Sequence, residues 1–328
     1  MHMSQVVPFP EEAVKQLFLG QLDFAQQCEL IEQLSADLLC VETLTQLTHC
    51  ARQFEQHVAP VPVGTLDIVG TGGDGMHTLN FSTLSAMTVA ALGHPVAKHG
   101  NRSVTSRCGS IDLLQQFGVP LPKTASAARA LLQTSGLAFL FAGYFHPAFA
   151  HVMQARQWFA EQGRKTIFNV LGPLINPAHV RHMLVGVYDP RLLRPYACAL
   201  QQLGVQAAYI VHGYGLDEAT LTGPTQYIRV RGDELVEGIW RPMDFALSAC
   251  ALADIQGGSP AENFSQSQAL LSGKLTGPKR DMVILNAGLA LHIAYEFSVD
   301  LHDCLQQVAE VLASGKVWDF VSCLSGKY

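Results

Sequence analysis

The sequence predicts an α/β protein in which a small α-helical domain is hinged to a large α/β domain with a mostly parallel central sheet. Residues 9–58 show helical periodicity and no strand pattern. The run Pro-Val-Pro-Val-Gly at 60–64 interrupts that periodicity and is typical of a hinge. From residue 66 onward, short apolar runs alternate with helical patterns, which predicts βαβ units and a parallel sheet.

The N-terminal region has its apolar residues at helical spacing. They are Leu30, Ile31, Leu34, Leu38, Leu39, Leu44 and Leu47. We therefore predict a small helical domain over residues 1–62 and a large α/β domain over residues 63–328.

The large domain is predicted to alternate strands with helices. Strands are expected at 66–70, 95–99, 137–141, 183–188 and 207–212 and around Ile228 and Leu235, and helices at 82–93, 110–117, 124–135, 146–162 and 191–203, followed by a mostly helical C-terminus. In such sheets ligands bind beyond the carboxyl ends of the strands.

The composition excludes several classes of protein. Charged residues make up 15% of the 328, apolar residues make up 48%, and the mean hydropathy is +0.19, which is typical of a compact enzyme. A net charge of −6 without a basic run disfavours nucleic-acid binding. The apolar runs at 137–145 and 282–294 are shorter than the ~18 residues of a membrane span. The N-terminus lacks an export signal, so a cytoplasmic protein is expected.

The cysteines and histidines form no recognisable metal motif. None of the eight cysteines has C-x-x-C spacing, so we expect reduced thiols. None of the thirteen histidines belongs to an H-E-x-x-H pattern, and His146 and His151 lie five residues apart, which is not the spacing of a helical ligand pair.

A glycine-rich loop lies within the segment D-I-V-G-T-G-G-D-G-M-H-T-L-N-F-S-T at 67–83. It matches the dinucleotide pattern G-x-G-x-x-G at Gly70, Gly72 and Gly75. A dinucleotide fold requires an acidic residue at the end of the second strand to hold the ribose. Lys98 and Arg102 occupy that region instead, and no P-loop lysine pattern is present. The sequence therefore argues against a nicotinamide dehydrogenase and against a P-loop enzyme.

The residues around this loop suit a phosphorylated, metal-bound ligand. Glycines let backbone amides approach phosphate oxygens, and cations and hydroxyls add charge and donors. A second helix N-terminus is expected at the Gly109-Ser110 step. Each glycine alone could simply serve a turn and each serine a helix cap, but the whole set lies within 45 residues: Lys98, Arg102, Ser82, Thr83, Ser106 and Ser110.

Two further positions have a structural and a functional interpretation. Asp217 and Glu218 follow a predicted strand end, and although adjacent carboxylates are usually solvated, this position favours Mg²⁺ ligands. Arg156 is the single cation of an apolar helical stretch. It is either a surface arginine or a receptor for a carboxylate.

These motifs together resemble the anthranilate phosphoribosyltransferases, which belong to the nucleoside phosphorylase/phosphoribosyltransferase class of glycosyltransferases. The resemblance runs from about residue 60 to the C-terminus. Its motifs are V-G-T-G-G-D-G with N-F-S-T, K-H-G-N-R-S-V-T-S with G-S-x-D-L-L, H-P-A-F, T-I-F-N-V-L-G-P-L-I-N-P-A, H-G-Y-G-L-D-E and V-I-L-N-A-G.

The resemblance implies transfer of phosphoribose from phosphoribosyl pyrophosphate to the amine of anthranilate, the second step of tryptophan biosynthesis, by a homodimer. The segment 146–175 would join the small domain in space. Anthranilate would be received by Gly70, Asn101 and Arg156, and Mg²⁺ by Ser82, Asp217 and Glu218. The phosphoribosyl substrate would be held by Gly70, Gly73, Asp74, Thr78, Asn80, Ser82, Thr83, Lys98, Ser106 and Ser110.

The chain departs from the family pattern at several positions. The N-terminal region lacks a Lys-Gly-Glu-Thr-type run, and Cys108, Ile111 and Lys165 replace the usual serine, small residue and arginine. No general base is identified, and His99 is a candidate only because it lies near Lys98 in sequence. The alternatives are a pyrimidine nucleoside phosphorylase-like enzyme and a non-catalytic nucleic-acid-binding homologue.

Overall fold

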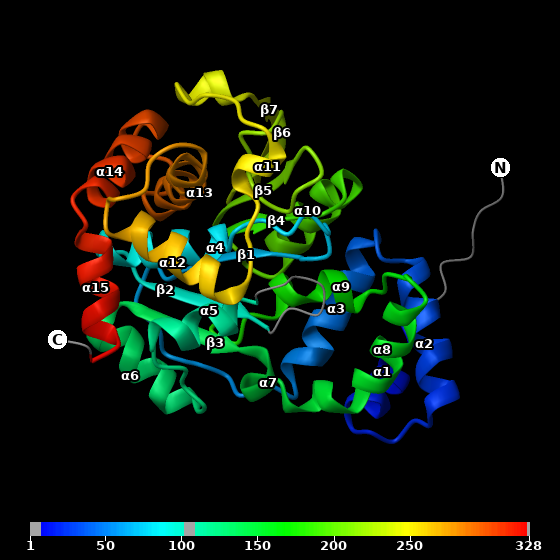
Figure 1. Cartoon of the computed structure of the whole chain (residues 1–328). Coiled ribbons are helices and arrows are strands. Elements are labelled where there is room, and N and C mark those ends of the chain that lie inside the picture. Colours follow the sequence, from blue (N-terminus) through cyan, green and yellow to red (C-terminus); the bar gives the residue numbers. More distant parts are fainter. Residues whose placement is uncertain (1–7, 102–108, 327–328) are drawn as a thin grey trace.

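The protein is built around one seven-stranded sheet in the order β3-β2-β1-β4-β5-β6-β7 (Figure 1). The computed structural model describes residues 8–101 and 109–326. Strands β1 to β5 are parallel, and β6 and β7 are antiparallel additions, which confirms the predicted α/β class. The strands are β1 (Leu66–Gly70), β2 (Val96–Gly100), β3 (Leu137–Phe141), β4 (His182–Gly186), β5 (Ala207–Gly213), β6 (Thr225–Arg231) and β7 (Glu234–Trp240).

The strand order reverses direction between β1 and β4. The chain adds β2 and β3 on one side of β1, then returns to place β4 and β5 on the other side. At such a switch point the two following loops diverge and leave a crevice beyond the carboxyl ends of the strands. Gly70 and Gly186, the last residues of β1 and β4, pair directly at this edge.

One face of the sheet is covered by the C-terminal helices together with α4 and α5. Ile68, Leu184 and Tyr209 point into this core. Every residue of helix α13 from 282 to 291 is buried, as expected of a central helix. The helices are α4 (Phe81–Ala91), α5 (Ser110–Phe117), α11 (Leu252–Ile255), α12 (Pro260–Leu271), α13 (Pro278–Ala294), α14 (Leu301–Ala313) and α15 (Lys316–Leu324), with η4 (Pro242–Phe245) preceding the C-terminal ones.

The opposite face carries α6 (Ala125–Ser135), α10 (Leu193–Gln202) and the N-terminal helices. Neighbouring strand residues such as Val69 and Val185 point to this side, as the two-residue period of a strand requires. Helix α3 (Val41–Arg52) packs against α10, where the Thr45 hydroxyl lies 3.0 Å from Gln202 Oε1. The N-terminal helices therefore attach to the sheet layer through α3.

The segment 147–175 lies beside the N-terminal helices, on the right of Figure 1. Helix α8 (Met153–Glu161) contacts α2 (Phe24–Ala36), and η1 (Pro147–Val152) contacts α1 (Glu11–Phe18). The helix predicted at 146–162 begins as a 3₁₀ turn, with Pro147 at its first position. The remaining elements of this part are α7 (Ala142–Phe145), α9 (Phe168–Leu171), η2 (Gly172–Ile175) and, before α10, η3 (Pro190–Leu192).

Three smaller expectations can be compared with the structure. The helix expected at 82–93 is α4, which begins one residue earlier, at Phe81, with Asn80 as its N-cap, so Ser82 and Thr83 lie in its first turn. The seven described cysteines are free thiols, and Cys108 lies outside the described residues. Within residues 8–101 and 109–326, no helix has both the length and the apolar character needed to cross a membrane.

Burial of His146 makes the stability of the fold sensitive to acid. Its side chain is buried against His99 and Phe149, and burial lowers the pKa of His146 to about 4. The unfolded chain takes up this proton near its ordinary value of 6.5, so the native state is stabilised above that pH and loses this contribution as pH falls from 6.5 to about 4.

We therefore expect the pH dependence of the unfolding free energy to change in the variant His146→Gln. Relative to this variant, the wild-type chain should lose roughly 2–4 kcal/mol between these two pH values, since one unit of pKa shift corresponds to ~1.4 kcal/mol. Urea unfolding at a series of pH values measures the difference. A constant offset between the two proteins across this range would show that His146 does not titrate as described.

Candidate active site

Three glycines at strand ends allow the loop 214–220 to lie across the carboxyl edge of the sheet. A Cβ on Gly70 or on Gly186 would overlap Asp217, and a Cβ on Gly213 would overlap the Glu218 carbonyl. These glycines end β1, β4 and β5 respectively. Glycine is required here for close approach, and the approach brings the predicted Asp-Glu pair to the glycine loop.

Three carboxylates meet at this edge. The Gly72 amide donates to Asp217 Oδ2 at 2.6 Å, and the Ser82 amide donates to Glu218 Oε1 at 3.3 Å. Asp74 lies close enough to Asp217 for its charge to act on that carboxyl group. The structure thus joins Asp74, which the sequence assigns only to the phosphoribosyl substrate, to the predicted metal ligands Ser82, Asp217 and Glu218.

The electrostatics of this group favour a bound cation. Burial, and then the charge of Asp74, raise the pKa of Asp217 to about 7. Burial, and then the charge of Asp217, raise the pKa of Glu218 well above its usual value. Glu218 Oε2 is buried and accepts no hydrogen bond from the described residues. Such mutual repulsion is relieved when a hard divalent cation shares the oxygens.

Two side chains outside the carboxylate group hold the loop in position. Asn286 of α13 accepts a hydrogen bond from the Ala219 amide at 3.1 Å and donates to the Ala219 carbonyl at 2.9 Å. His212 Nδ1 lies 2.8 Å from the Val187 carbonyl, and its Nε2 accepts from the Gly215 amide at 3.3 Å. These contacts fix the ring tautomer and the turn that precedes Asp217.

Lys98 is buried in β2 beside Asp67. Its ammonium donates to the Ile68 carbonyl at 2.5 Å. Asp67 accepts hydrogen bonds from the side-chain amide of Asn176 at 2.7 Å and from the backbone amide of His99 at 3.2 Å. Burial lowers the pKa of Lys98, and the charges of Asp67, Glu218 and Asp217 oppose that shift. The predicted phosphate-binding lysine therefore lies within the field of the carboxylate group.

His99 has the wrong properties for a general base. Its side chain is buried and its Nδ1 lies 3.2 Å from the Gly172 carbonyl. Burial lowers the pKa of His99 well below the ordinary value, and the charge of His146 acts in the same direction. The ring is a weak proton acceptor, so its position next to Lys98 in sequence does not indicate a catalytic role.

Arg156 lies on α8, away from the sheet, with its guanidinium 5.6 Å from the centre of the Phe168 ring. Burial lowers the pKa of Arg156. Among the described residues no carboxylate forms an ion pair with it. A half-buried guanidinium that forms no ion pair is unusual for a plain surface arginine. That Arg156 receives a ligand together with Gly70 and Asn101 stays a prediction.

Lys165 is a site residue that the sequence analysis noted only as a replacement. Its ammonium donates to the Gly73 carbonyl at 2.8 Å and lies 3.4 Å from the centre of the Tyr188 ring. It connects the segment after α8 to the glycine loop. Thr71, in the glycine loop, also holds Tyr188 in place, because its hydroxyl accepts a hydrogen bond from the Tyr188 backbone amide at 3.1 Å.

The other predicted residues lie in the loop after β1, in α4, at the start of α5 and outside the described residues. Thr78 pairs with Gln256 in an isolated bridge, and Thr83 is buried with its hydroxyl unpartnered in the described chain. Ser110 is the first residue of α5, after its N-cap Gly109. Ser106 and Arg102 lie outside the described residues.

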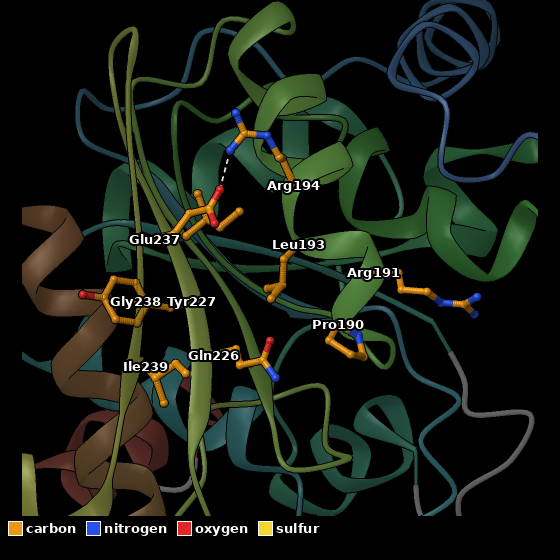
Figure 2. A pocket seen from close by; sticks show the side chains of 10 residues that line it. Pro190, Arg191, Leu193, Arg194, Gln226, Tyr227, Glu237, Gly238 and Ile239 are labelled. Atoms are coloured by element: carbon orange, nitrogen blue, oxygen red, sulfur yellow. Dashed lines mark hydrogen bonds and ion pairs between the residues drawn. The ribbon is translucent and has the colours of Figure 1, made fainter. Parts of the chain in front are cut away.

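A shallow pocket elsewhere on the surface is separate from the predicted site residues. It lies between the start of α10 and the strands β6 and β7, and the ion pair of Arg194 with Glu237 crosses it (Figure 2). None of its lining residues belongs to the predicted site: Pro190, Arg191, Leu193, Arg194, Gln226, Tyr227, Ile228, Glu237, Gly238 and Ile239.

Known proteins share both the sequence and the fold. The family described as "Glycosyl transferase family, a/b domain" matches residues 63–318. An anthranilate phosphoribosyltransferase of Desulfitobacterium hafniense (strain Y51) is 44% identical over 319 residues, covering 96% of this chain and 93% of the relative. The enzyme of that name from Shewanella amazonensis is 41% identical over 325 residues, covering 95% and 91%.

Two solved structures show the same architecture. The anthranilate phosphoribosyltransferase of Thermus thermophilus superposes with a TM-score of 0.87 at 36% identity, covering 96% of this chain and 93% of that one. The enzyme of that name from Saccharomyces cerevisiae, in complex with PRPP and Mg, gives 0.86 at 26% identity, covering 97% and 93%.

Proposed function

Since the chain belongs to the anthranilate phosphoribosyltransferase family of glycosyltransferases, we propose that it transfers the phosphoribosyl group of 5-phosphoribosyl 1-pyrophosphate to the amine of anthranilate. The products are N-(5-phosphoribosyl)anthranilate and pyrophosphate, in the second step of tryptophan biosynthesis. The observation that carries the proposal is the meeting of Asp74, Asp217 and Glu218 with the glycine loop at the β1/β4 switch point.

Magnesium fits the carboxylate group. All of its side chains offer hard oxygen atoms, and one buried carboxylate oxygen of Glu218 accepts no hydrogen bond from the described residues. Ser82, Asp217 and Glu218 would hold the ion, with Asp74 adjacent. When bound, Mg²⁺ supplies positive charge that offsets the charge of pyrophosphate.

The phosphoribosyl substrate is proposed to lie along the carboxyl edge of the sheet. The amides of the loop at Gly70 and Gly73 and the N-terminus of α4 would face its oxygens. Lys98 would add a cation once its ammonium turns from the Ile68 carbonyl. The complete proposed set is Gly70, Gly73, Asp74, Thr78, Asn80, Ser82, Thr83, Lys98, Ser106 and Ser110.

Anthranilate is proposed to bind where the helical part meets this edge, with Gly70 and Asn101 on one side and Arg156 on the other. The aromatic amine is neutral near pH 7, so it can attack the anomeric carbon without a general base, in keeping with the buried, weakly basic His99. The chain's own task is to fix both substrates and to exclude water while charge develops on the leaving group.

Domain closure would supply that exclusion of water. We propose that residues 1–62, joined by about 146–175, move relative to the rest of 63–328 about the proline run. The contact of Lys165 with the Gly73 carbonyl crosses between these two parts, and this contact would break and form as they open and close.

We further propose a cytoplasmic homodimer. Exposed apolar residues on the N-terminal helices, Leu19 and Phe24 among them, support an interface there.

Loss of anthranilate fluorescence in the presence of phosphoribosyl pyrophosphate and Mg²⁺ tests the proposed reaction. The alternative activity of a pyrimidine nucleoside phosphorylase is assayed with inorganic phosphate and thymidine or uridine. Turnover in the second assay and none in the first would overturn the proposal. A purely nucleic-acid-binding homologue would be inactive in both assays.

A test of Lys98 separates the two substrates. The variant Lys98→Met keeps most of the buried stem and removes one charge-assisted contact, worth roughly 1.5–3 kcal/mol. We expect the KM for phosphoribosyl pyrophosphate to rise about 10- to 150-fold, while the KM for anthranilate changes little. The matched control is Lys274→Met, because Lys274 lies in the turn after α12, outside the proposed site. Equal weakening of both substrates would argue against a phosphate contact.

A further inference from the structure

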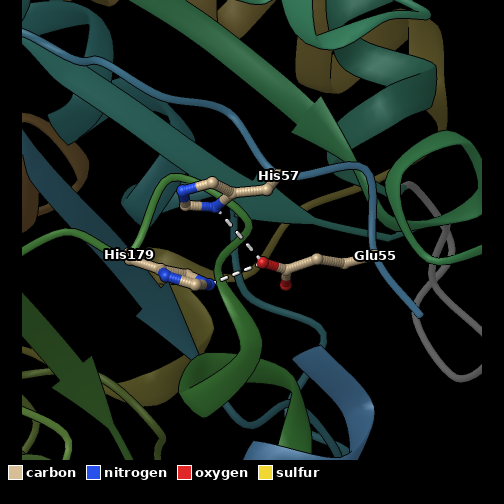
Figure 3. A group of neighbouring side chains, drawn as sticks. All are labelled: Glu55, His57 and His179. Atoms are coloured by element: carbon tan, nitrogen blue, oxygen red, sulfur yellow. Dashed lines mark ion pairs between the residues drawn. The ribbon is translucent and has the colours of Figure 1, made fainter. Parts of the chain in front are cut away.

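A second group of potential metal ligands lies at the junction of the helical part and the sheet. Glu55 and His57 belong to the segment after α3, and His179 belongs to the turn before β4 (Figure 3). Each side chain offers one ligand atom, and these atoms lie within 4.8 Å of one another. Two of the three residues precede residue 63, where the family match begins.

Among the described residues, the buried Glu55 carboxylate has ion-pair contacts only with His57 and His179, which are charged only when protonated. Its side chain is 1% exposed, and neither oxygen accepts a hydrogen bond from the described residues. Both histidine rings turn a nitrogen to the same oxygen, with His57 Nδ1 at 3.3 Å and His179 Nε2 at 2.5 Å. Arg52 acts on Glu55 through its charge but forms no ion pair with it in the described chain.

The nitrogen of His179 that faces Glu55 is also unsatisfied. Nε2 is buried and makes no hydrogen bond within the described residues, although the carboxylate oxygen lies 2.5 Å away. An imidazole nitrogen and a buried carboxylate that lie this close without an aligned hydrogen bond satisfy each other poorly, whereas a cation shared between them is attracted by both. This arrangement is suited to ligands of one ion.

From these contacts we propose that Glu55, His57 and His179 bind one divalent transition-metal ion of the zinc class. Two imidazoles and one carboxylate are a ligand set for Zn²⁺ or Co²⁺, whereas Mg²⁺ prefers oxygen atoms alone. Ligands of a tetrahedral zinc ion lie roughly 3.4 Å apart, because each is ~2.1 Å from the metal. The separation of His57 Nδ1 from Glu55 already matches this spacing, and that of His179 would widen.

The site is open to solvent on its histidine side. The rings of His57 and His179 are 45% and 35% exposed and lie 4.2 Å apart between centres. His57 Nδ1 lies 2.9 Å from the Pro177 carbonyl, which can only accept a hydrogen bond, so this nitrogen must lose its proton and leave the carbonyl before it binds the metal. A water molecule completes the coordination.

The bound ion would tie the segment after α3 to the turn before β4, close to the proline run. It therefore acts as a clamp between the helical part and the sheet and is separate from the Mg²⁺ site at the carboxyl edge. We expect Zn²⁺ to raise the melting temperature of the full chain, because an ion that binds only the folded state stabilises it.

Titration of the metal-free full chain with Co²⁺ tests the proposal, because tetrahedral cobalt absorbs visible light strongly. We expect one equivalent of bound Co²⁺ without the intense near-ultraviolet bands of cobalt bound to cysteine, and displacement by Zn²⁺. In the variant His57→Asn/His179→Asn the affinity should fall by more than the roughly 10- to 100-fold that follows loss of a group that only orients a ligand.

Two controls separate this site from others. His302→Asn removes a histidine that is 62% exposed on α14, and Asp217→Asn/Glu218→Gln removes the proposed Mg²⁺ ligands. Both should keep the cobalt signal. Absence of stoichiometric binding in the wild-type chain, or a signal unchanged in the double histidine variant, would overturn the proposal. If circular dichroism shows that the double variant is unfolded, the single variant His57→Asn decides by the same criterion.

Discussion

Replacement of Asp217 by Asn together with Glu218 by Gln is expected to abolish most turnover and to leave the fold intact. The two side chains share the carboxyl edge of the sheet with Asp74, and burial together with their mutual repulsion raises their pKa values, which a shared cation would offset. Neutral amides carry no negative charge, so the variant should lose most of its affinity for Mg²⁺. The loss of kcat/KM should reach at least the roughly 10²–10³-fold that follows removal of one preorganised electrostatic contact.

The exposed pair Asp233 and Glu234, the last residue of the β6–β7 turn and the first residue of β7, provides a matched control. It too is an adjacent Asp-Glu pair, but it lies away from the glycine loop. Asp233→Asn/Glu234→Gln should retain nearly full activity and the same dependence on Mg²⁺. Full activity in the Asp217/Glu218 variant would refute the assignment of the metal ligands.

The fold was largely predictable because its signals are local. Strands such as 66–70 and 207–212 are short apolar runs bounded by glycine or proline, and helices such as α5 start after a glycine. Each of these signals lies within a few residues of the element that it defines. The start of α4 was predicted one residue late, because Asn80 and the two hydroxyl residues Ser82 and Thr83 are all acceptable caps by type.

The site was predictable only in part, because its contacts join distant parts of the chain. The Asp-Glu pair was recognisable from its position after a strand, but its hydrogen bond to the Gly72 amide spans 145 residues. The need for glycine at Gly186 and Gly213 arises from the returning loop and has no local signal. The contacts of Glu55 and His57 with His179 also join distant parts of the chain and match no spacing motif.

Replacement of Arg156 by alanine is expected to weaken anthranilate and to spare phosphoribosyl pyrophosphate. The guanidinium is half-buried beside Phe168 and forms no ion pair in the described chain, so its charge is available for a ligand. A guanidinium can meet a planar carboxylate with two parallel hydrogen bonds. Their loss should cost about 1.5–3 kcal/mol, or roughly a 10- to 150-fold rise in the KM for anthranilate where that constant tracks affinity.

Lysine at this position should restore the binding only partly, because an ammonium group cannot form the bidentate contact. Arg164→Ala is the matched control: this arginine follows α8, is 44% exposed and pairs with Glu32 at the surface. Its removal should leave both KM values nearly unchanged. Steady-state kinetics with each substrate varied in turn measures these effects. An unchanged KM for anthranilate in Arg156→Ala would return this residue to the role of a helix-surface arginine packed on Phe168.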